Sequence, residues 1–290
     1  MRHAVLGTGG VGGLIGGALA RIGADVVLVM RPETLARYPG RLEVRSRVLG
    51  DFVVDVPATV ELDREVDVVW VTTKATQLAS ALPLIPSARV GEATVVPLLN
   101  GVDHVALLRS VYARVVAGAL RVESERVDVG HIRQSSPFVR VDLVGDGPLV
   151  AEMRAAGFDC RVCDDELTLL WQKMVFLAPV ALATTAFDGP LGTVRHGTQF
   201  GRCQEETLAV ADAEGAKVDV AALRTLLESV PDSMRSSMQR DVEHGQSPEL
   251  DAIAGPIVRG GKKHGIATPA TEQLVDLVSA RSQQSANRET

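Results

Sequence analysis

The sequence is short of several features that would assign it to a specialised class of protein. Three cysteines in 290 residues cannot form a disulfide framework, so we expect reduced thiols in a cytoplasmic protein. Lysine and arginine are scattered and the net charge is −6, which disfavours nucleic acid or an anionic membrane as partner. No apolar run reaches transmembrane length. The composition, 46% hydrophobic and 23% charged, is that of a soluble globular protein.

Two further features, the apolar start of the chain and a C-x-x-C pair, could suggest a secretory signal and a metal or redox site, but neither is favoured. The apolar start His3–Leu6 is short and runs straight into glycines, which favours a first β-strand over the hydrophobic region of a secretory signal. Cys160 and Cys163 form a C-x-x-C pair, but neither a second pair of metal ligands nor a helix start accompanies them. We therefore interpret them as ordinary strand cysteines and expect no metal site.

The first half of the chain alternates short apolar strands with helical segments. This alternation predicts parallel strands joined by right-handed crossovers. Polar and apolar residues then alternate along 122–144, which is typical of antiparallel strands. The expected strands are 4–6, 25–30, 67–72, 94–99 and 115–120, with helices at 11–22, 76–84 and 102–112 and short strands in 42–60.

From about Asp164 the strand-like runs stop and helical spacing takes over. The sequence therefore predicts an α/β protein with two domains, residues 1–163 being of the Rossmann type and residues 164–290 all-α. The polar tail from about Ser282 is expected to fray. The expected helices of the second domain are 166–184, 199–214, 220–230, 249–264 and 271–279.

A glycine-rich turn follows the first strand and opens the first helix. It matches G-x-G-x-x-G, which is a weak pattern alone but a specific one in this context. The first glycine permits the tight turn, the second lets the backbone approach a pyrophosphate, and the last lets the helix pack on the strand. We predict that a dinucleotide binds here. The motif reads Gly7-Thr8-Gly9-Gly10-Val11-Gly12.

Arg31 ends the second strand, where the adenosine ribose of a bound dinucleotide is expected. A site for NAD usually carries a carboxylate at this point, whereas a 2′-phosphate is better served by arginine. Glu33 follows only two residues later. The position favours NADP, the alternative being a solvated surface arginine.

The chain resembles the ketopantoate reductase (2-dehydropantoate 2-reductase) family along nearly its whole length. Each matching piece is short and unspecific, but their order and spacing are specific. The pieces are 7–12, 71–77, 98–102, 171–174, 236–238 with Asp241, 248–251 and 265–269.

The resemblance implies an NADP-dependent oxidoreductase of pantothenate biosynthesis that acts on a CH–OH group. Hydride passes from the nicotinamide to the carbonyl carbon of a 2-oxo acid, and a lysine protonates the resulting alkoxide. Lys173 matches that general acid and Glu249 matches the carboxylate that holds the lysine and contacts the substrate. The alternatives are a solvated lysine on an amphipathic helix and a carboxylate that only complements a helix dipole.

Three more residues are assigned by the same resemblance. Ser237 matches a serine that hydrogen-bonds the substrate carboxylate, with helix capping as the alternative. Asn100 follows a buried strand and is expected to contact cofactor and substrate, although a plain Asn-Gly turn would look the same. Lys74 also ends a strand and is expected near the cofactor, with a surface lysine as the alternative.

The departures from the family pattern concern its asparagines. The family carries them four and eight residues after the lysine, where this chain has Leu177 and Ala181. Two others correspond to Leu191 and Ala254, and the chain holds only Asn100 and Asn287 to compensate. Pro179 is expected to interrupt and kink the catalytic helix.

Lysine and glutamate thus persist while the polar lining is lost. We expect reduction of a 2-oxo acid by NADPH, of the ketopantoate-to-pantoate type. The alternatives are a reductase of the same family with a more apolar substrate, and a catalytically idle NADP-binding protein. A small-molecule substrate and no nucleic acid or membrane partner are expected, with a homodimer left open.

Overall fold

The computed structural model describes residues 1–145 and 147–286, and contacts divide the chain into two compact units. Unit 1 comprises Met1–Leu99 and His104–Glu166. Unit 2 comprises Asn100–Asp103 and the chain from Leu167 onward. The short segment Asn100–Asp103 therefore belongs to the helical unit although its flanks do not, which the sequence did not indicate.

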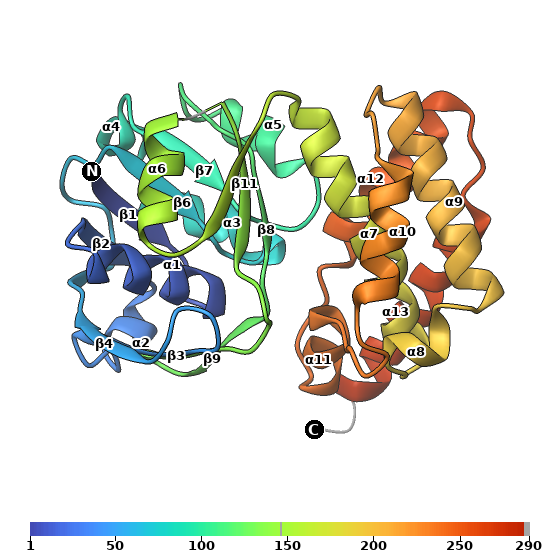
Figure 1. Ribbon diagram of the computed structural model, residues 1–290, viewed down its shortest axis with the longest axis horizontal. Helices are drawn as coiled ribbons and strands as arrows, with labels where there is room; N and C mark the ends of the chain where they lie inside the picture. The colour runs from blue at the N-terminus through green and yellow to red at the C-terminus, as the bar shows by residue number, and fades with distance from the viewer. Residues whose placement is uncertain (146, 287–290) are drawn as a thin grey trace. The chain divides into compact units, whose positions relative to one another are not determined.

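Unit 1 is built on a five-stranded parallel sheet, as the alternation of strands and helices predicts (Figure 1). The strand expected at 115–120 does not belong to it, because residues 118–121 pair antiparallel in another sheet. The first strand lies at the centre of the parallel sheet, so the glycine turn emerges from the middle of the carboxyl edge, where α/β sheets bind ligands. The strands, in spatial order, are β5 (Ala58–Thr59), β2 (Asp25–Val29), β1 (Arg2–Leu6), β6 (Val68–Val71) and β7 (Thr94–Pro97).

Two smaller sheets complete the strands of this unit. The expected antiparallel pairing of β9 with β10 is present, but β10 also pairs in parallel with β3, which a local pattern cannot reveal. One sheet has the order β4 (Phe52–Asp55), β3 (Arg41–Ser46), β10 (His131–Gln134), β9 (Ser124–Asp128). The other has β12 (Asp159–Cys163), β11 (Arg140–Val144), β8 (Gly118–Arg121).

Helix α1 (Gly10–Arg21) is buried between two of these sheets, and its glycines make this possible. A Cβ on Gly16 would press on Leu28 of the parallel sheet. On the other side, a Cβ on Gly13 would collide with Ile132 of β10. The glycine content of this helix is therefore a packing requirement on both faces, beyond the turn that opens it.

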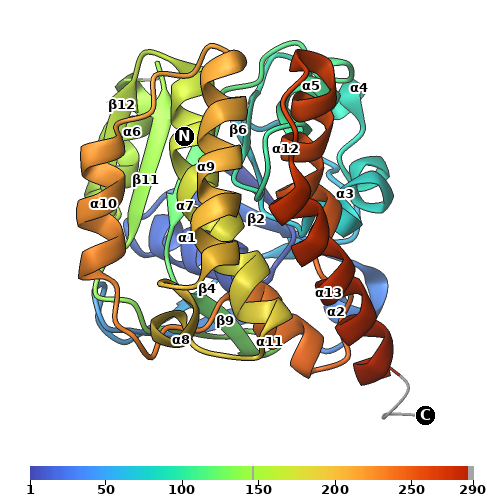
Figure 2. The same ribbon diagram turned by 90° about the vertical axis from the view of Figure 1, so that its right-hand side faces the viewer.

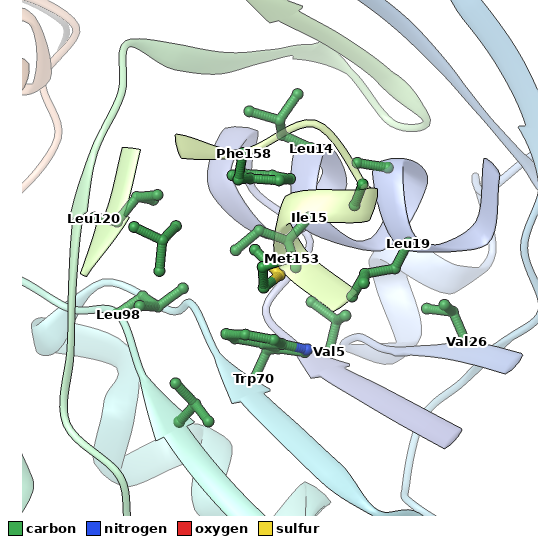
Figure 3. Close-up of a cluster of buried hydrophobic side chains, with 14 of the residues drawn as sticks. Val5, Leu14, Ile15, Leu19, Val26, Trp70, Leu98, Leu120, Met153 and Phe158 are labelled. Carbon is green, nitrogen blue, oxygen red and sulfur yellow. The ribbon is translucent and has the colours of Figure 1, made fainter. Parts of the chain in front are cut away.

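The main core of unit 1 forms around this helix (Figure 3). Trp70, Met153 and Phe158 are fully or almost fully buried there with the aliphatic side chains of α1. The remaining helices of the unit are short: α2 (Pro32–Leu35), α3 (Ala75–Ala81), the 3-10 turn Leu82–Leu84, α4 (Ser87–Val90), α5 (His104–Arg109) and α6 (Gly147–Ala155).

Unit 2 is entirely helical among the described residues, so the structure confirms the predicted change of character (Figure 2). Helices α9, α12 and α13 pack against one another. The short helices α8 and α11 were not predicted, because one or two turns leave no periodic pattern. The helices are α7 (Glu166–Ala186), α8 (Leu191–Val194), α9 (Thr198–Ala213), α10 (Val220–Ser229), α11 (Ser237–Glu243), α12 (Leu250–His264) and α13 (Pro269–Ala286).

Two expectations about chain segments need correction. Pro179 does not interrupt the helix around it, because α7 continues from Glu166 to Ala186, while the expected kink stays a prediction. A proline removes one backbone hydrogen bond, and the burial of both flanking turns keeps the segment helical. The tail expected to fray from Ser282 is helical to Ala286, and 287–290 lie outside the described residues.

Helix α7 is also the one described helix long and apolar enough to cross a membrane. This differs from the expectation that no apolar run of the sequence reaches transmembrane length. Of its most apolar window, 67% is buried inside the protein. Trp171, Met174 and Leu182 contribute this burial within the core of unit 2, which is the behaviour of a core helix.

His3 is a buried titratable group at the start of β1, with no exposed surface. The indole Nε1 of Trp70 donates to His3 Nδ1 over 3.2 Å, and His3 Nε2 lies 3.0 Å from Glu152 Oε2. This pattern requires a neutral ring that accepts at Nδ1 and donates at Nε2. Burial lowers the pKa of His3 below its usual 6.5, against the opposing effect of Glu152.

We therefore expect stability to fall as the pH drops below the range in which a free histidine titrates. The unfolded chain gains a proton on His3 near pH 6.5, whereas the folded chain gains it only at lower pH. The contribution of His3 is thus fully present above pH 6.5 and lost as the pH falls through the folded pKa. Urea unfolding between pH 8 and pH 5 measures it. A His3→Gln variant with the same pH dependence as the parent protein would contradict this.

Candidate functional site

The glycine turn of unit 1 is held by the neighbouring strands. Gly7 has φ +91°, which a residue with a side chain adopts at a cost, and its N–H donates to Val29 of β2 over 3.2 Å. The hydroxyl of Thr72, just after β6, donates to the Gly7 carbonyl over 2.6 Å. A Cβ on Gly12 would collide with that same carbonyl. Gly7 and Gly12 thus have the turn-forming and packing roles that the motif predicts.

Gly9 and Gly10 differ sharply in their surroundings. A Cβ on Gly9 would meet nothing within 4 Å, so space is open beside this residue at the start of α1. A Cβ on Gly10 would collide with the backbone of Ser124 and Glu125 in β9, and the Ser124 hydroxyl donates to the Gly10 carbonyl over 2.8 Å. Gly9 leaves room for a ligand, whereas Gly10 is needed for packing.

The first turn of α1 also has an open hydrogen-bonding capacity. Its N-cap residue is Gly9, which has no side chain to accept from the first N–H groups. Such a helix start, 12 residues long and preceded by an open glycine, attracts phosphate groups. Thr8 is partly exposed beside it, while Val11 packs against the core of unit 1.

The two basic residues predicted near the cofactor both follow strands of the parallel sheet. Arg31 precedes α2 with its side chain 60% exposed, and its Nε lies 3.2 Å from Glu33 Oε1. An arriving phosphate would therefore compete with Glu33 for the guanidinium. Lys74 directly precedes α3 and is partly exposed.

Asn100 and Glu249 are brought together in unit 2. Glu249 is the residue before α12 and is only 7% exposed. The side-chain amide of Asn100 donates to Glu249 Oε2 over 3.0 Å, across 149 positions of sequence. A charge-assisted hydrogen bond of this kind offsets part of the cost of burying a carboxylate. Asn100 is therefore not a plain turn residue, and Glu249 is more than a complement to the helix dipole.

Lys173 lies in the first half of α7, partly exposed between buried turns. Its neighbours Trp171 and Met174 are in the core of unit 2, which fixes the helix that carries it. A lysine held on a packed helix and only partly exposed suits proton donation better than a fully solvated one.

The sequence leaves two roles open for Ser237, substrate binding and helix capping. The structure gives the capping role to its neighbour Ser236, at the start of α11. Ser236 caps the helix, because its hydroxyl accepts from the N–H of Gln239 over 3.1 Å. It is buried, and it also accepts from Thr184 in α7 over 2.8 Å. Ser237 is the exposed first residue of the helix, so capping is not its role.

The C-x-x-C cysteines both lie in β12, as the sequence interpretation has it. Burial raises the pKa of the Cys160 thiol to about 11, which opposes redox reactivity. Among residues 1–145 and 147–286, no group of three or more His, Cys, Asp and Glu side chains is arranged to hold a metal ion.

Comparison with known proteins decides the family. The model of "Ketopantoate reductase PanE/ApbA" matches residues 3–143, and the model of its C-terminal domain matches residues 166–282. This chain belongs to the ketopantoate reductase family. The family makes it an oxidoreductase.

Relatives of the same length support this assignment. A 2-dehydropantoate 2-reductase of Caulobacter vibrioides is 30% identical, over 96% of this chain and 98% of its own. An uncharacterized oxidoreductase of Bacillus subtilis is 29% identical, over 94% and 96%. The crystal structure of a PanE/ApbA family ketopantoate reductase from Ralstonia eutropha superposes with a TM-score of 0.89 at 29% identity, covering 98% of this chain and 99% of the other.

The positions at which the ketopantoate reductase resemblance implies asparagines fall into two groups. Leu177 is partly exposed on α7, one turn after Lys173. Ala181, Leu191 and Ala254 are at most 2% exposed and belong to the core of unit 2. These three side chains pack in the apolar core, so Leu177 is the replacement that still reaches the surface.

Sequence reasoning missed two residues that shape the glycine turn of this family member. Thr72 pins the Gly7 carbonyl, and Ser124 holds the Gly10 carbonyl from a strand more than a hundred residues away. The place of Thr72 directly after a buried strand was an available signal. No local signal marks Ser124, because only the folding of β9 onto α1 brings it there.

The contrast between Gly9 and Gly10 gives a paired prediction. Gly10→Ala should lower the free energy of unfolding by about 1–3 kcal/mol, because its Cβ meets a strand backbone that cannot move away. Gly9 has φ −74° and ψ −166°, which alanine adopts, so Gly9→Ala should leave stability unchanged or raise it by up to about 1 kcal/mol. Urea unfolding of both variants checks this. Equal losses would show that the packing on β9 is not the cause.

Proposed function

We propose that this protein reduces a 2-oxo acid to a 2-hydroxy acid with NADPH, the ketopantoate-to-pantoate type of reaction. Residues 1–163 form the cofactor domain and residues 164–290 the catalytic domain. The observation that carries the proposal is the buried carboxylate of Glu249, hydrogen-bonded by Asn100 in a chain of the ketopantoate reductase family.

The open space beside Gly9 fits the pyrophosphate of a dinucleotide, which the uncapped start of α1 attracts. When bound, the nicotinamide supplies the hydride. Arg31 would hold the 2′-phosphate of NADP in place of Glu33, and Lys74 and Asn100 would supply the remaining contacts. The full set of cofactor residues is Gly7, Thr8, Gly9, Gly10, Val11, Gly12, Arg31, Lys74 and Asn100, with Gly10 acting through the packing of the turn.

Four residues of unit 2 act on the substrate. Ser237, exposed on α11, donates to its carboxylate, and Asn100 and Glu249 hold its polar groups. Lys173 gives its ammonium proton to the carbonyl oxygen as the carbonyl carbon is reduced, and Glu249 orients the lysine. The reaction consumes a small metabolite in the cytoplasm.

A second candidate substrate follows from Leu177, which is partly exposed where the family resemblance implies an amide. A leucine cannot pair with the hydroxyl of ketopantoate, and a buried unpaired polar group costs about 1–3 kcal/mol. This favours an oxo acid with an apolar branch. The buried Glu249–Asn100 pair speaks against an idle NADP-binding protein, which would have no use for it.

The decisive experiment measures NADPH oxidation with a panel of 2-oxo acids. We expect a higher kcat/KM for an oxo acid with an apolar branch than for ketopantoate. Leu177→Asn should shift the ratio of the two toward ketopantoate, whereas Leu177→Ala, which adds room but no amide, should not. A preference of the unmodified protein for ketopantoate would remove the second candidate, and no turnover of any oxo acid would remove the first.

Replacement of the catalytic pair tests the mechanism. Lys173→Ala should lower kcat roughly 10²–10⁴-fold while NADPH binding stays nearly intact, because the general acid is lost. Glu249→Ala should act in the same direction. The double variant should lose less than the product of the two losses, since the residues act as a unit. Full activity of Lys173→Ala in steady-state kinetics would refute this role.

Arg31 sets the expected cofactor preference. NADPH should bind at least about tenfold tighter than NADH, a difference of about 1.4 kcal/mol. Arg31→Ala should erase most of this preference, and Glu33→Gln, which frees the guanidinium from its ion pair, should preserve or enlarge it. Titration calorimetry with both cofactors measures the ratio. Equal affinities in the unmodified protein would contradict the assignment.

A further inference from the structure

We propose that Arg259 is a positioning residue that, through Asp103, holds the segment Asn100–Asp103 on α12 so that Asn100 reaches Glu249. The geometric part concerns unit 2 alone. Its consequence for catalysis rests on the function proposed above. Neither Arg259 nor Asp103 was singled out by the sequence.

Three contacts join the segment to α12. At its start, Asn100 donates to Glu249 over 3.0 Å. In its middle, Gly101 lies so close to the helix that a Cβ would collide with the Ala252 carbonyl. At its end, the guanidinium of Arg259 binds the carboxylate of Asp103. The segment is thus attached at both ends and pressed against the helix between them.

The two helix positions lie on one side of α12. At 100° per residue, residues 252 and 259 fall within about 20° of each other around the helix axis, and Glu249 directly precedes the helix. A segment of four residues can therefore follow this side of the helix without leaving it. The backbone of Gly101, at φ +90°, takes the conformation that keeps it close.

Arg259 has a second acidic partner that does not belong to the segment. Its Nη1 donates to Asp251 Oδ1 over 2.6 Å, while its Nη2 serves Asp103. The hydrogen bonds that the guanidinium donates to Asp251 and Asp103 raise its pKa, so it stays charged. Because all three side chains are about half exposed or more, their pairing adds little stability. The guanidinium instead fixes the direction in which the Asp103 carboxylate is held, because its N–H groups lie in one rigid plane.

Loss of the Asp103 attachment would leave the segment held by Asn100, Gly101 and the packing of Val102 on the core of unit 2. Gly101 is then a pivot, and the Asn100 amide has more positions open to it. Small misplacements of this kind reduce catalysis because the reacting groups are less often in line. Asp103 and Asp251 form a matched pair for a test, since each is an exposed aspartate bound to Arg259 but only Asp103 lies in the segment.

The direct test observes the Asn100 amide without any assay of activity. The chain has two asparagines, Asn100 and Asn287, so asparagine-selective ¹⁵N labelling gives two side-chain amide signals. Asn100→Ala assigns them. We expect Glu249→Ala to shift the Asn100 signal and Asp103→Ser and Arg259→Gln to shift it in the same direction. Asp251→Ser should leave it in place. An unmoved signal in Asp103→Ser, or equal shifts in the Asp103 and Asp251 variants, would overturn the proposal.

Kinetics with NADPH and the best oxo acid of the panel then tests the catalytic consequence. Asp103→Ser should lower kcat/KM for the oxo acid about tenfold, with Asp251→Ser unchanged. In an Asn100→Ala background, Asp103→Ser should have no further effect, because the residue that it positions is gone. An equal loss in both backgrounds would overturn positioning through Asn100. A shifted amide signal with unchanged kinetics would leave the attachment standing and refute the role of Asn100 in the proposed function.

Discussion

The burial of the Glu249 carboxylate is the constraint on which the arrangement of the helical unit depends. A buried carboxylate needs hydrogen-bond donors, and one of them is the side-chain amide of Asn100. Asn100 follows the last strand of the parallel sheet, so the chain leaves that sheet, runs for four residues with the helical unit, and returns. This hydrogen bond is one of the contacts that hold the segment on the helical unit.

The glycine turn of unit 1 has a different requirement. It packs closely at Gly7, Gly10 and Gly12 and leaves open space beside Gly9. Thr72 and Val29 fix Gly7, and β9 covers Gly10. The Gly7 carbonyl lies against Gly12, and Leu28 of the parallel sheet lies against Gly16. Of the four glycines in the motif, only Gly9 has open space where an added Cβ would lie. Close packing of the other glycines makes the open space beside Gly9 a defined place.

The apolar residues at positions where the family resemblance implies asparagines are of two kinds, buried core residues and the partly exposed Leu177. Ala181 and Ala254 are buried with the core residues, so their side chains serve the stability of the helical unit. Leu177 is partly exposed one turn from Lys173, so its side chain is not confined to the core. The continuous path of α7 through Pro179 agrees with this division, because a well-packed helix tolerates one missing hydrogen bond.

The local sequence pattern was enough to predict the parallel sheet, the change to helices near residue 164 and the glycine motif. Each of these is marked by residues that lie close together in the sequence. The resemblance to ketopantoate reductase added Lys173 and Glu249. Tertiary structure alone decided what depends on distant residues. It paired β10 with β3, covered Gly10 with Ser124, made Ser236 rather than Ser237 the cap of α11, and joined Asn100 to Glu249. These contacts arise when the chain buries its apolar surface, and no short stretch of sequence contains both partners.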